Sequence, residues 1–338
     1  MKWLKLLAET GARFSNLRVD FCMEIFVSYI TDRFSKLQAF WKRAAEAERQ
    51  AGAFFGTDTS EELDLGGLVQ VIDWGSKRVM KKASLPTPAG FDFGADGVYL
   101  AVGGSRIAVL DERLNVTREL SHRLFNVVHS VNISEKGILV SSSGVDSIIE
   151  VNQYGDELFV WSAVEHGYNV DPKGRQRAVD LKIDHRMVKY PTLQQATHIN
   201  SAVYAGTTCF SKETVYASLF HQGQIVAIDK LTKKCEVVLS GLRHPHAVYM
   251  NGDDIIFSDT ENQKVMLTDK NFKNCRSLHF SQANWIQDAS FLSNGNIILA
   301  DSNNNRILEV EPSNGRVIDE FKYSPEYKVY SVKEMVLR

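Results

Sequence analysis

Two stretches of the sequence decide the fold: HAVYMNGDDIIFSD (His246–Asp259) and DASFLSNGNIILAD (Asp288–Asp301). Each contains two short runs of apolar residues around a tight turn, and each is followed by a polar turn and a further run. Similar stretches begin at Ala89, His129 and His198. A repeat of about 40 residues is typical of propellers and solenoids. We therefore expect five copies of one β-unit.

Each copy contains four short strands, which is the content of one propeller blade. A sixth blade forms if the C-terminal run Val329–Leu337 joins strands from about residues 67–85. This pairing closes the ring and removes exposed sheet edges, which invite aggregation. We predict an all-β, six-bladed β-propeller over residues 61–338, with five or seven blades as the alternatives. A solenoid also repeats, but it gives no reason for the two ends to complement each other.

The first 60 residues show a different pattern. Between residues 19 and 51, apolar side chains recur at every third or fourth position, and several alanines follow before Gly52. We predict an N-terminal helical extension, residues 1–60, with one amphipathic helix over 19–51. Its aromatic stripe must be covered by the rest of the chain or by a second subunit, so a homo-oligomer through this helix is one expectation. A membrane-surface helix is the alternative, which acidic residues on the polar face weaken.

The composition is that of an ordinary globular protein, with 338 residues, 24% of them charged, and a net charge of -2. This balance removes the usual electrostatic attraction to nucleic acid. No stretch approaches the ~20 apolar residues of a membrane span, and Glu9 interrupts the first apolar run before a signal peptide forms. We expect a cytoplasmic protein that binds a small-molecule substrate, with no nucleic-acid partner and no membrane span.

The repeat register places His129, His198, His246 and Asp288 at the starts of consecutive inner strands, at one end of the central channel. Imidazole nitrogens and carboxylate oxygens are ligands that zinc, iron and manganese accept. We therefore expect these four residues to bind a divalent transition metal. The same groups also suit metal-free acid–base chemistry, because histidine titrates near neutrality.

One connection breaks the regularity of the repeat. About residues 163–197, which precede the copy at His198, form a far longer loop than the others. Long loops in compact repeats are commonly lids or binding loops. We expect Tyr168, Arg175 and His185 to act beside His198 as catalytic or substrate-orienting residues, since arginine and tyrosine suit an anionic substrate. A surface excursion with solvated charges is the alternative.

Several segments resemble known propeller families. The segments LRHPHAVYM (242–250), DDIIFSDTENQKV (253–265) and GNIILADSNNNRILEVEP (295–312) resemble NHL-type six-bladed propellers and the related gluconolactonase-like and peptidyl-amidoglycolate lyase propellers. The segments VNQYGDELFVW (151–161) and THINSAVYAG (197–206) look like arylsulfotransferase-type propellers. Together these resemblances cover roughly residues 66–338.

Each resemblance implies a different chemistry in the channel. The lyase resemblance implies zinc held by three histidines, in this sequence His129, His198 and His246. The sulfotransferase resemblance implies that a channel histidine, His198 in this sequence, accepts the sulfuryl group. Gluconolactonase-like members bind their metal through Glu, Asn and Asp, and the histidines at these positions make calcium a less expected metal.

We therefore predict an enzyme whose histidine-rich metal site catalyses a lyase, hydrolase or cyclisation-type reaction on a small, anionic substrate. Metal-free group transfer through His198 is one alternative. A non-catalytic propeller that binds a protein or peptide is the other.

Overall fold

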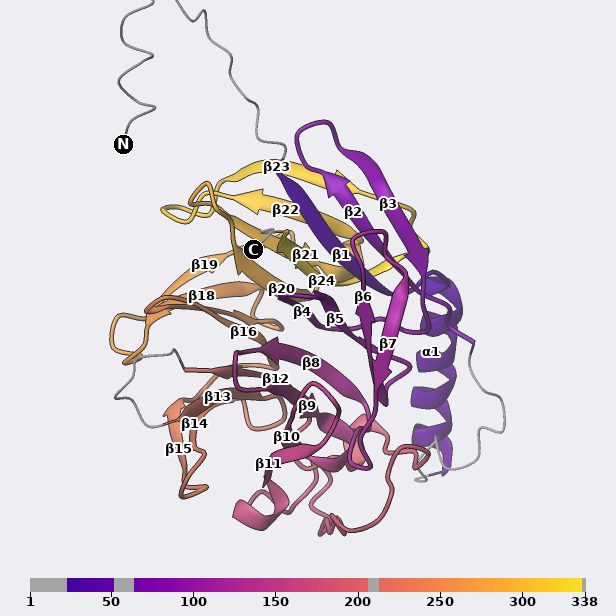
Figure 1. The fold of residues 1–338 in the computed structure, drawn as a ribbon, viewed down its shortest axis with the longest axis vertical. Helices are drawn as coiled ribbons and strands as arrows, with labels where there is room; N and C mark the ends of the chain where they lie inside the picture. The colour runs from indigo at the N-terminus through magenta and orange to yellow at the C-terminus, as the bar shows by residue number, and fades with distance from the viewer. Residues whose placement is uncertain (1–22, 52–63, 206–212, 336–338) are drawn as a thin grey trace, which may run out of the picture.

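The computed structural model describes residues 23–51, 64–205 and 213–335. Its strands form six four-stranded antiparallel sheets, which are the blades of a propeller (Figure 1). The six-bladed fold predicted from the repeat is confirmed. Within these residues, no helix is long and apolar enough to cross a membrane.

Each blade runs from an inner strand at the channel to an outer strand at the surface. In that order, blade 1 contains β24 (Lys328–Glu334), β1 (Glu24–Thr31), β2 (Leu68–Asp73) and β3 (Arg78–Ser84). Blade 2 contains β4 (Phe91–Gly94), β5 (Gly97–Val102), β6 (Arg106–Leu110) and β7 (Val116–Leu120). Blade 3 contains β8 (Val128–Ile133), β9 (Ile138–Ser142), β10 (Ser147–Val151) and β11 (Glu157–Ser162).

The other three blades follow in the same order. Blade 4 contains β12 (Ile199–Tyr204), β13 (Thr214–Leu219), β14 (Gln224–Asp229) and β15 (Cys235–Leu239). Blade 5 contains β16 (Pro245–Asn251), β17 (Asp254–Asp259), β18 (Lys264–Asp269) and β19 (Arg276–His279). Blade 6 contains β20 (Ile286–Phe291), β21 (Ile297–Asp301), β22 (Arg306–Val310) and β23 (Val317–Lys322). The helical elements are α1 (Phe34–Ala51), η1 (Ser143–Val145), η2 (Val164–His166), η3 (Thr192–Gln194) and η4 (Ser302–Asn304).

Blade 1 joins the two ends of the chain. The C-terminal strand β24 shares a sheet with β2 and β3 as predicted, but it pairs with β1, which lies between β24 and β2. The prediction of one helix over residues 19–51 is therefore wrong for residues 24–31. Strand β1 is buried along nearly its whole length, and periodicity cannot tell such a continuous apolar run from a buried helical segment. Residues 19–22 lie outside the described residues.

Helix α1 lies in the connection between the second and third strands of blade 1, along the right-hand side of the view in Figure 1. Its start is fixed to the propeller, because the Phe34 N–H donates to the carbonyl oxygen of Glu326 at 2.9 Å. Phe34 and Leu37 are buried, and the Lys328 Nζ lies 5.1 Å from the centroid of the Phe34 ring. The propeller therefore covers this part of the apolar stripe. Trp41 remains 45% exposed, and a homo-oligomer through the helix stays a prediction.

The hydrophobic core is divided among the gaps between blades. Six buried clusters are present, and each takes its members mainly from two neighbouring blades. Between blades 4 and 5, for example, Val203 and Ile225 pack with Val248 and Phe257. Such close-packed interfaces resist deformation. They therefore fix where each inner strand begins, which is where the candidate site lies.

The long connection, residues 163–197, is tied to blade 3 through Asp146. The Asp146 carboxylate is fully buried and forms an ion pair with Arg177. It also accepts hydrogen bonds from the backbone N–H groups of Thr197 at 2.7 Å and His198 at 3.2 Å. A buried carboxylate needs such partners to remain charged. Asp146 therefore fixes the connection and sets the position of His198.

Replacement of Asp146 by alanine should free the long connection. The variant leaves the Arg177 guanidinium buried without a counter-ion, a change that typically costs about 3–5 kcal/mol. We expect a lower free energy of unfolding in urea and rapid proteolytic cleavage within residues 163–197. Asp184→Ala is the matched control, because Asp184 pairs with Arg186 at the surface of the same connection and exposed pairs contribute about 0–1 kcal/mol. Equal behaviour of the two variants would contradict the anchoring role of Asp146.

Candidate functional site

The inner strands begin at one end of the channel, which we call the mouth. Near the mouth, four inner strands contain a β-bulge, and the unpaired residues are His129, Asn200, Gln287 and Tyr330. In blade 5, His246 occupies the matching position, just before a register shift. His198 therefore lies two residues before its expected position, and Asp288 lies one residue after. The expected equivalence of these two with His129 and His246 is wrong, because bulges and unequal hairpin lengths displace the register without marking the sequence.

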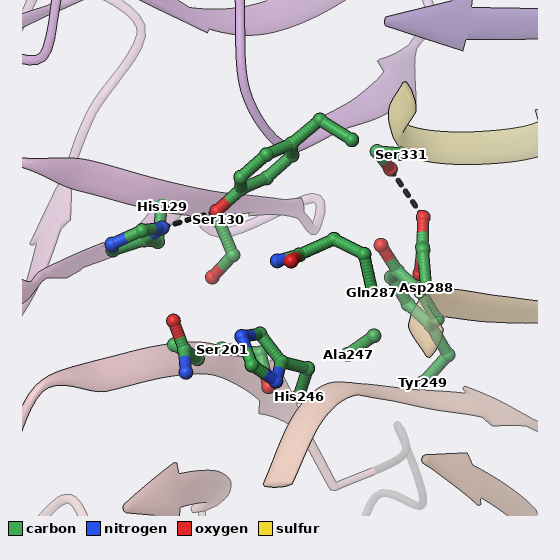
Figure 2. Close-up of a pocket in the computed structure, with 12 residues that line it drawn as sticks. His129, Ser130, Ser201, His246, Ala247, Tyr249, Gln287, Asp288 and Ser331 are labelled. Carbon is green, nitrogen blue, oxygen red and sulfur yellow. Dashed lines mark hydrogen bonds between the residues drawn. The ribbon is translucent and has the colours of Figure 1, made fainter. Parts of the chain in front are cut away.

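A small cavity lies among the inner strands below the mouth (Figure 2). Its volume is about 20 Å³, which accommodates about one water molecule. All six inner strands or the residues just before them contribute to its walls, through Gly90, His129, Ser130, Asn200, Ser201, His246, Ala247, Tyr249, Gln287, Asp288, Tyr330 and Ser331. The structure thus brings His129, His246 and Asp288 to one cavity. The cavity is therefore too small for a substrate larger than water.

A polar network crosses the channel deeper along the inner strands. The Lys333 Nζ donates to the carbonyl oxygen of Phe91 at 2.7 Å and lies 3.3 Å from the Asp92 carboxylate. Asp92 also accepts hydrogen bonds from the Asn132 side chain and the Ile133 N–H, both at 2.9 Å. These contacts link the inner strands of blades 1, 2 and 3. They pair the charged groups of Lys333 and Asp92 below the mouth.

His246 is held in one tautomer. Its Nδ1 lies 2.9 Å from the carbonyl oxygen of His244 and 2.8 Å from the Thr260 hydroxyl. A carbonyl only accepts, so Nδ1 must bear the proton. The Thr260 hydroxyl donates instead to the carbonyl oxygen of Ile286 at 2.8 Å. The free lone pair of the neutral ring is therefore on Nε2.

His198 is held in the same tautomer by the long connection. Its Nδ1 is hydrogen bonded to the Oε1 of Gln195. The orientation of this amide is fixed, because the Gln195 Nε2 donates to the carbonyl oxygen of Tyr190 at 2.7 Å. An amide oxygen only accepts, so the His198 Nδ1 bears the proton and Nε2 has the lone pair. His198 also lies against His129, with ring centroids 4.7 Å apart.

Burial keeps these imidazoles neutral. Desolvation lowers the pKa of His129 to about 4 and that of His246 to about 3. The pKa of His198 lies well below its ordinary value, chiefly because the ring is desolvated and secondarily because other histidines surround it. The His129 Nδ1 is hydrogen bonded to the Tyr330 hydroxyl, and its buried Nε2 has no partner among the described residues. At neutral pH the site therefore offers uncharged rings rather than imidazolium ions.

Asp288 is the acidic group of the cavity, and its side chain is shown near Ser331 in Figure 2. Its Oδ2 accepts hydrogen bonds from the Ser331 hydroxyl at 2.5 Å and the Val332 N–H at 2.8 Å. The Oδ1 atom is buried and has no partner within the part of the chain that the structure describes. Desolvation raises the pKa of Asp288 to about 6, although these hydrogen bonds and the charge of Lys333 oppose the shift. Asp288 can therefore hold a proton in mildly acidic solution.

The stability of the protein relative to an Asp288→Asn variant should fall as the pH rises. The folded-state pKa of about 6 exceeds the unfolded value of about 3.9, so the folded state binds an extra proton between these values. The wild-type advantage is then complete below about pH 4 and is lost by on the order of 2–3 kcal/mol as the pH rises through 6. Urea unfolding of both proteins at pH 4, 5, 6 and 7 measures this difference. A difference independent of pH would show that Asp288 does not titrate in this range.

The expected metal ligands do not form a metal site as they stand. Considering only the residues described, no group of three or more His, Cys, Asp or Glu side chains is arranged to hold a metal ion. One oxygen of Asp288 is engaged by Ser331 and Val332, and one nitrogen of His129 is engaged by Tyr330. The other atoms, the Asp288 Oδ1 and the His129 Nε2, have no partner among the described residues, so a zinc, iron or manganese site stays a prediction.

The catalytic residues expected in the long connection have structural contacts. His185 is 1% exposed, with Nδ1 2.8 Å from the Tyr190 hydroxyl and Nε2 2.7 Å from the carbonyl oxygen of Asp180. The Arg175 Nε donates to Asp171 at 2.7 Å. Tyr168 packs against the cluster between blades 3 and 4. His198 is the expected catalytic residue that lies beside a histidine of the cavity, and catalytic roles for the other three stay predictions.

Two residues of the site carry no signal in the sequence. Gln195, which fixes the tautomer of His198, lies in an irregular connection that matches no other copy. Gln287 extends across the channel toward the side on which His129 lies, as Figure 2 shows. The sequence alone does not distinguish it from the adjacent Asp288 as the residue facing the channel, because the β-bulge at Gln287 is not visible there. The hydrogen bond to His198 identifies Gln195, and the pairing register identifies Gln287.

No family model and no curated protein matches this sequence. Solved structures do match its fold. A protein of unknown function from Bacteroides caccae is 10% identical, with a TM-score of 0.59, over 93% of this chain and 98% of that chain. A chain of a nidogen/laminin complex is 9% identical, with a TM-score of 0.58, over 94% of this chain and 99% of that chain.

Virginiamycin B lyase from Staphylococcus aureus is 11% identical, with a TM-score of 0.50, over 72% of this chain and 73% of that chain. At these identities the similarity shows a shared fold, and function must be argued from the site. The finer resemblances to NHL-type, gluconolactonase-like, amidoglycolate lyase and sulfotransferase propellers stay predictions.

Proposed function

We propose that this chain is an enzyme that catalyses a lyase-type elimination on a small substrate bound at the mouth, with the His198 Nε2 as the base. The observation that carries this proposal is the fixed tautomer of His198, set by Gln195, whose own amide is held by Tyr190. Such partners orient a reactive imidazole and determine which nitrogen reacts. A lyase with a similar propeller fold, virginiamycin B lyase, is compatible with this proposal.

The elimination has a balanced proton path. The Nε2 lone pair removes a proton from the substrate carbon, the carbon–leaving group bond breaks, and a double bond forms. The Nδ1–H bond to Gln195 stabilises the transient imidazolium. Because burial disfavours this charge, the proton does not remain on His198. It passes to the leaving group, so the products are the unsaturated compound and the protonated leaving group.

The proposal requires no metal, and the metal-dependent version remains an outcome of the test. A separate observation supports the alternative that this propeller binds a protein or peptide without catalysis. The long connection exposes five large apolar side chains, Val170, Ile183, Met187, Val188 and Leu193. Such a surface suits a protein or peptide partner. That alternative predicts partner binding that survives alanine at His129, His198 and His246.

Nitrogen-15 NMR of the imidazoles tests the premise without a substrate. We expect His198 and His246 to be neutral at pH 7, with the proton on Nδ1, because burial lowers both pKa values, that of His246 to about 3. Gln195→Leu should release the His198 tautomer and leave His246 unchanged. A protonated ring at pH 7, or an Nε2–H tautomer in the wild type, would overturn the assignment.

Turnover of a panel of β-hydroxy acids, lactones and cyclic esters, followed by mass spectrometry, tests the activity. His198→Ala should lower the rate by about 10²–10⁴-fold. Gln195→Leu should lower it by about 10–100-fold, as does the loss of a partner that orients a reactive histidine. His279→Ala, on the exposed face of outer strand β19, is the matched control. Full turnover in His198→Ala excludes His198 as the base. Loss of turnover after chelation, restored by zinc, would favour the metal-dependent version.

A further inference from the structure

We propose that Phe220, His244 and Trp285, which we call the mouth platform, bind a flat, uncharged aromatic ring. The inference names the substrate class of the site and rests on the proposed function only for the reaction that follows binding. The platform takes one ring from each of three consecutive blades. Phe220 lies in the turn after β13, and His244 and Trp285 lie just before the inner strands β16 and β20.

The three rings form one continuous group. Phe220 stacks on His244, with centroids 4.1 Å apart and an interplanar angle of 12°. Trp285 lies 6.1 Å from His244 and 6.3 Å from Phe220. These separations fall at or near the range in which aromatic rings attract one another. All three rings are partly exposed, whereas the neighbouring His198 and His246 are buried.

The backbone presents His244 and Trp285, together with His198, through a recurring conformation. His198, His244 and Trp285 have φ values of 50°, 54° and 75°, and each is the residue immediately before an inner strand. Val127, at the matching place in blade 3, has a φ of 50°. The left-handed conformation is therefore a feature of the repeat, and the choice of ring side chains in blades 4 to 6 is what distinguishes this side of the mouth.

The platform is suited to an uncharged ligand. Desolvation keeps His244 neutral, since burial lowers its pKa despite the nearby Glu261 carboxylate. The nearby Arg243 is paired with Glu261 at 2.9 Å. The Trp285 Nε1–H is occupied by the Gln287 Oε1 at 2.8 Å, so the indole contributes its apolar surface to a ligand. Ring stacking and apolar contact are then the main attractions available.

The platform adjoins the proposed base. Phe220 lies 5.0 Å from the His198 ring and 5.3 Å from the His246 ring, and Trp285 lies 5.7 Å from the His246 ring. A ring bound to the platform would therefore lie close to these imidazoles. Because binding orients the reacting group, the platform would determine which substituent meets the Nε2 lone pair.

Saturation-transfer NMR on the full chain, with phenol, cyclohexanol and tetramethylammonium as separate probes, tests the inference. Phenol should bind most tightly. Phe220→Ala and Trp285→Ala should each weaken phenol binding by roughly 2- to 10-fold, since aromatic pairs contribute at this level. Trp285→Phe should retain most of the phenol binding, because the variant keeps an aromatic ring at this position. It loses only the hydrogen bond to Gln287. Trp41→Ala, which removes a 45% exposed indole on α1, should leave binding unchanged.

Several outcomes would overturn the platform. If cyclohexanol binds as tightly as phenol, the platform does not select a flat ring. If tetramethylammonium binds more tightly than phenol, the platform is a cation site instead. Unchanged phenol binding in both alanine variants with native melting temperatures would also exclude it. His198→Ala separates the two proposals. If His198→Ala retains both phenol binding and turnover, the platform is supported and His198 is excluded as the base. If His198→Ala loses turnover, and phenol binding is unchanged in Phe220→Ala and Trp285→Ala, His198 is supported as the base and the platform is excluded.

Discussion

The rest of the structure depends on the pairing of β24 with β1. This ladder places a C-terminal strand beside an N-terminal one within blade 1 and closes the ring of six blades. Without it, two sheet edges would be exposed. The channel would also lose Tyr330, Ser331 and Lys333, which β24 contributes to its walls and its deeper network. Closure is therefore a condition for the site as well as for the fold.

A closed and tightly packed ring explains the electrostatics of the site. The packed inner strands desolvate the rings at the channel, and this desolvation is the largest cause of the lowered pKa values of His129, His198 and His246. The same cause raises the pKa of Asp288. Desolvation thus moves acids and bases alike toward their neutral forms. At neutral pH the channel histidines are therefore uncharged, whereas Asp288, with a pKa of about 6, is mostly ionised.

The long connection is the main departure from the repeat, and its influence on the site is indirect. Asp146 and Arg177 anchor it in the interior, and Gln195 then determines which nitrogen of His198 is free. His185 and Arg175, which the sequence predicts to be functional, form hydrogen bonds within the connection itself. The long connection thus orients His198, which lies just before an inner strand of the propeller.

Much of the architecture could be predicted from the sequence because blades repeat. Turn residues and apolar runs recur at a regular spacing, so the strands of blades 2 to 6 can be predicted. The same pattern predicts that the run Val329–Leu337 helps to close the ring. The segment Glu24–Thr31 was not, because a strand buried on both faces has no periodicity to distinguish it from a helix. The histidine-rich mouth was also accessible, since His129 and His246 fall at matching places in their copies.

The sequence by itself determined the six-bladed ring and the end of the channel where histidines gather, because both follow from local patterns that repeat. Only the tertiary structure decided which side chains share the cavity, which imidazole nitrogen is free, and that Phe220, His244 and Trp285 meet as one surface. These features depend on bulges, pairing register and contacts between blades distant in the sequence. Such contacts arise only when the chain packs, and their energies are not encoded in any single repeat.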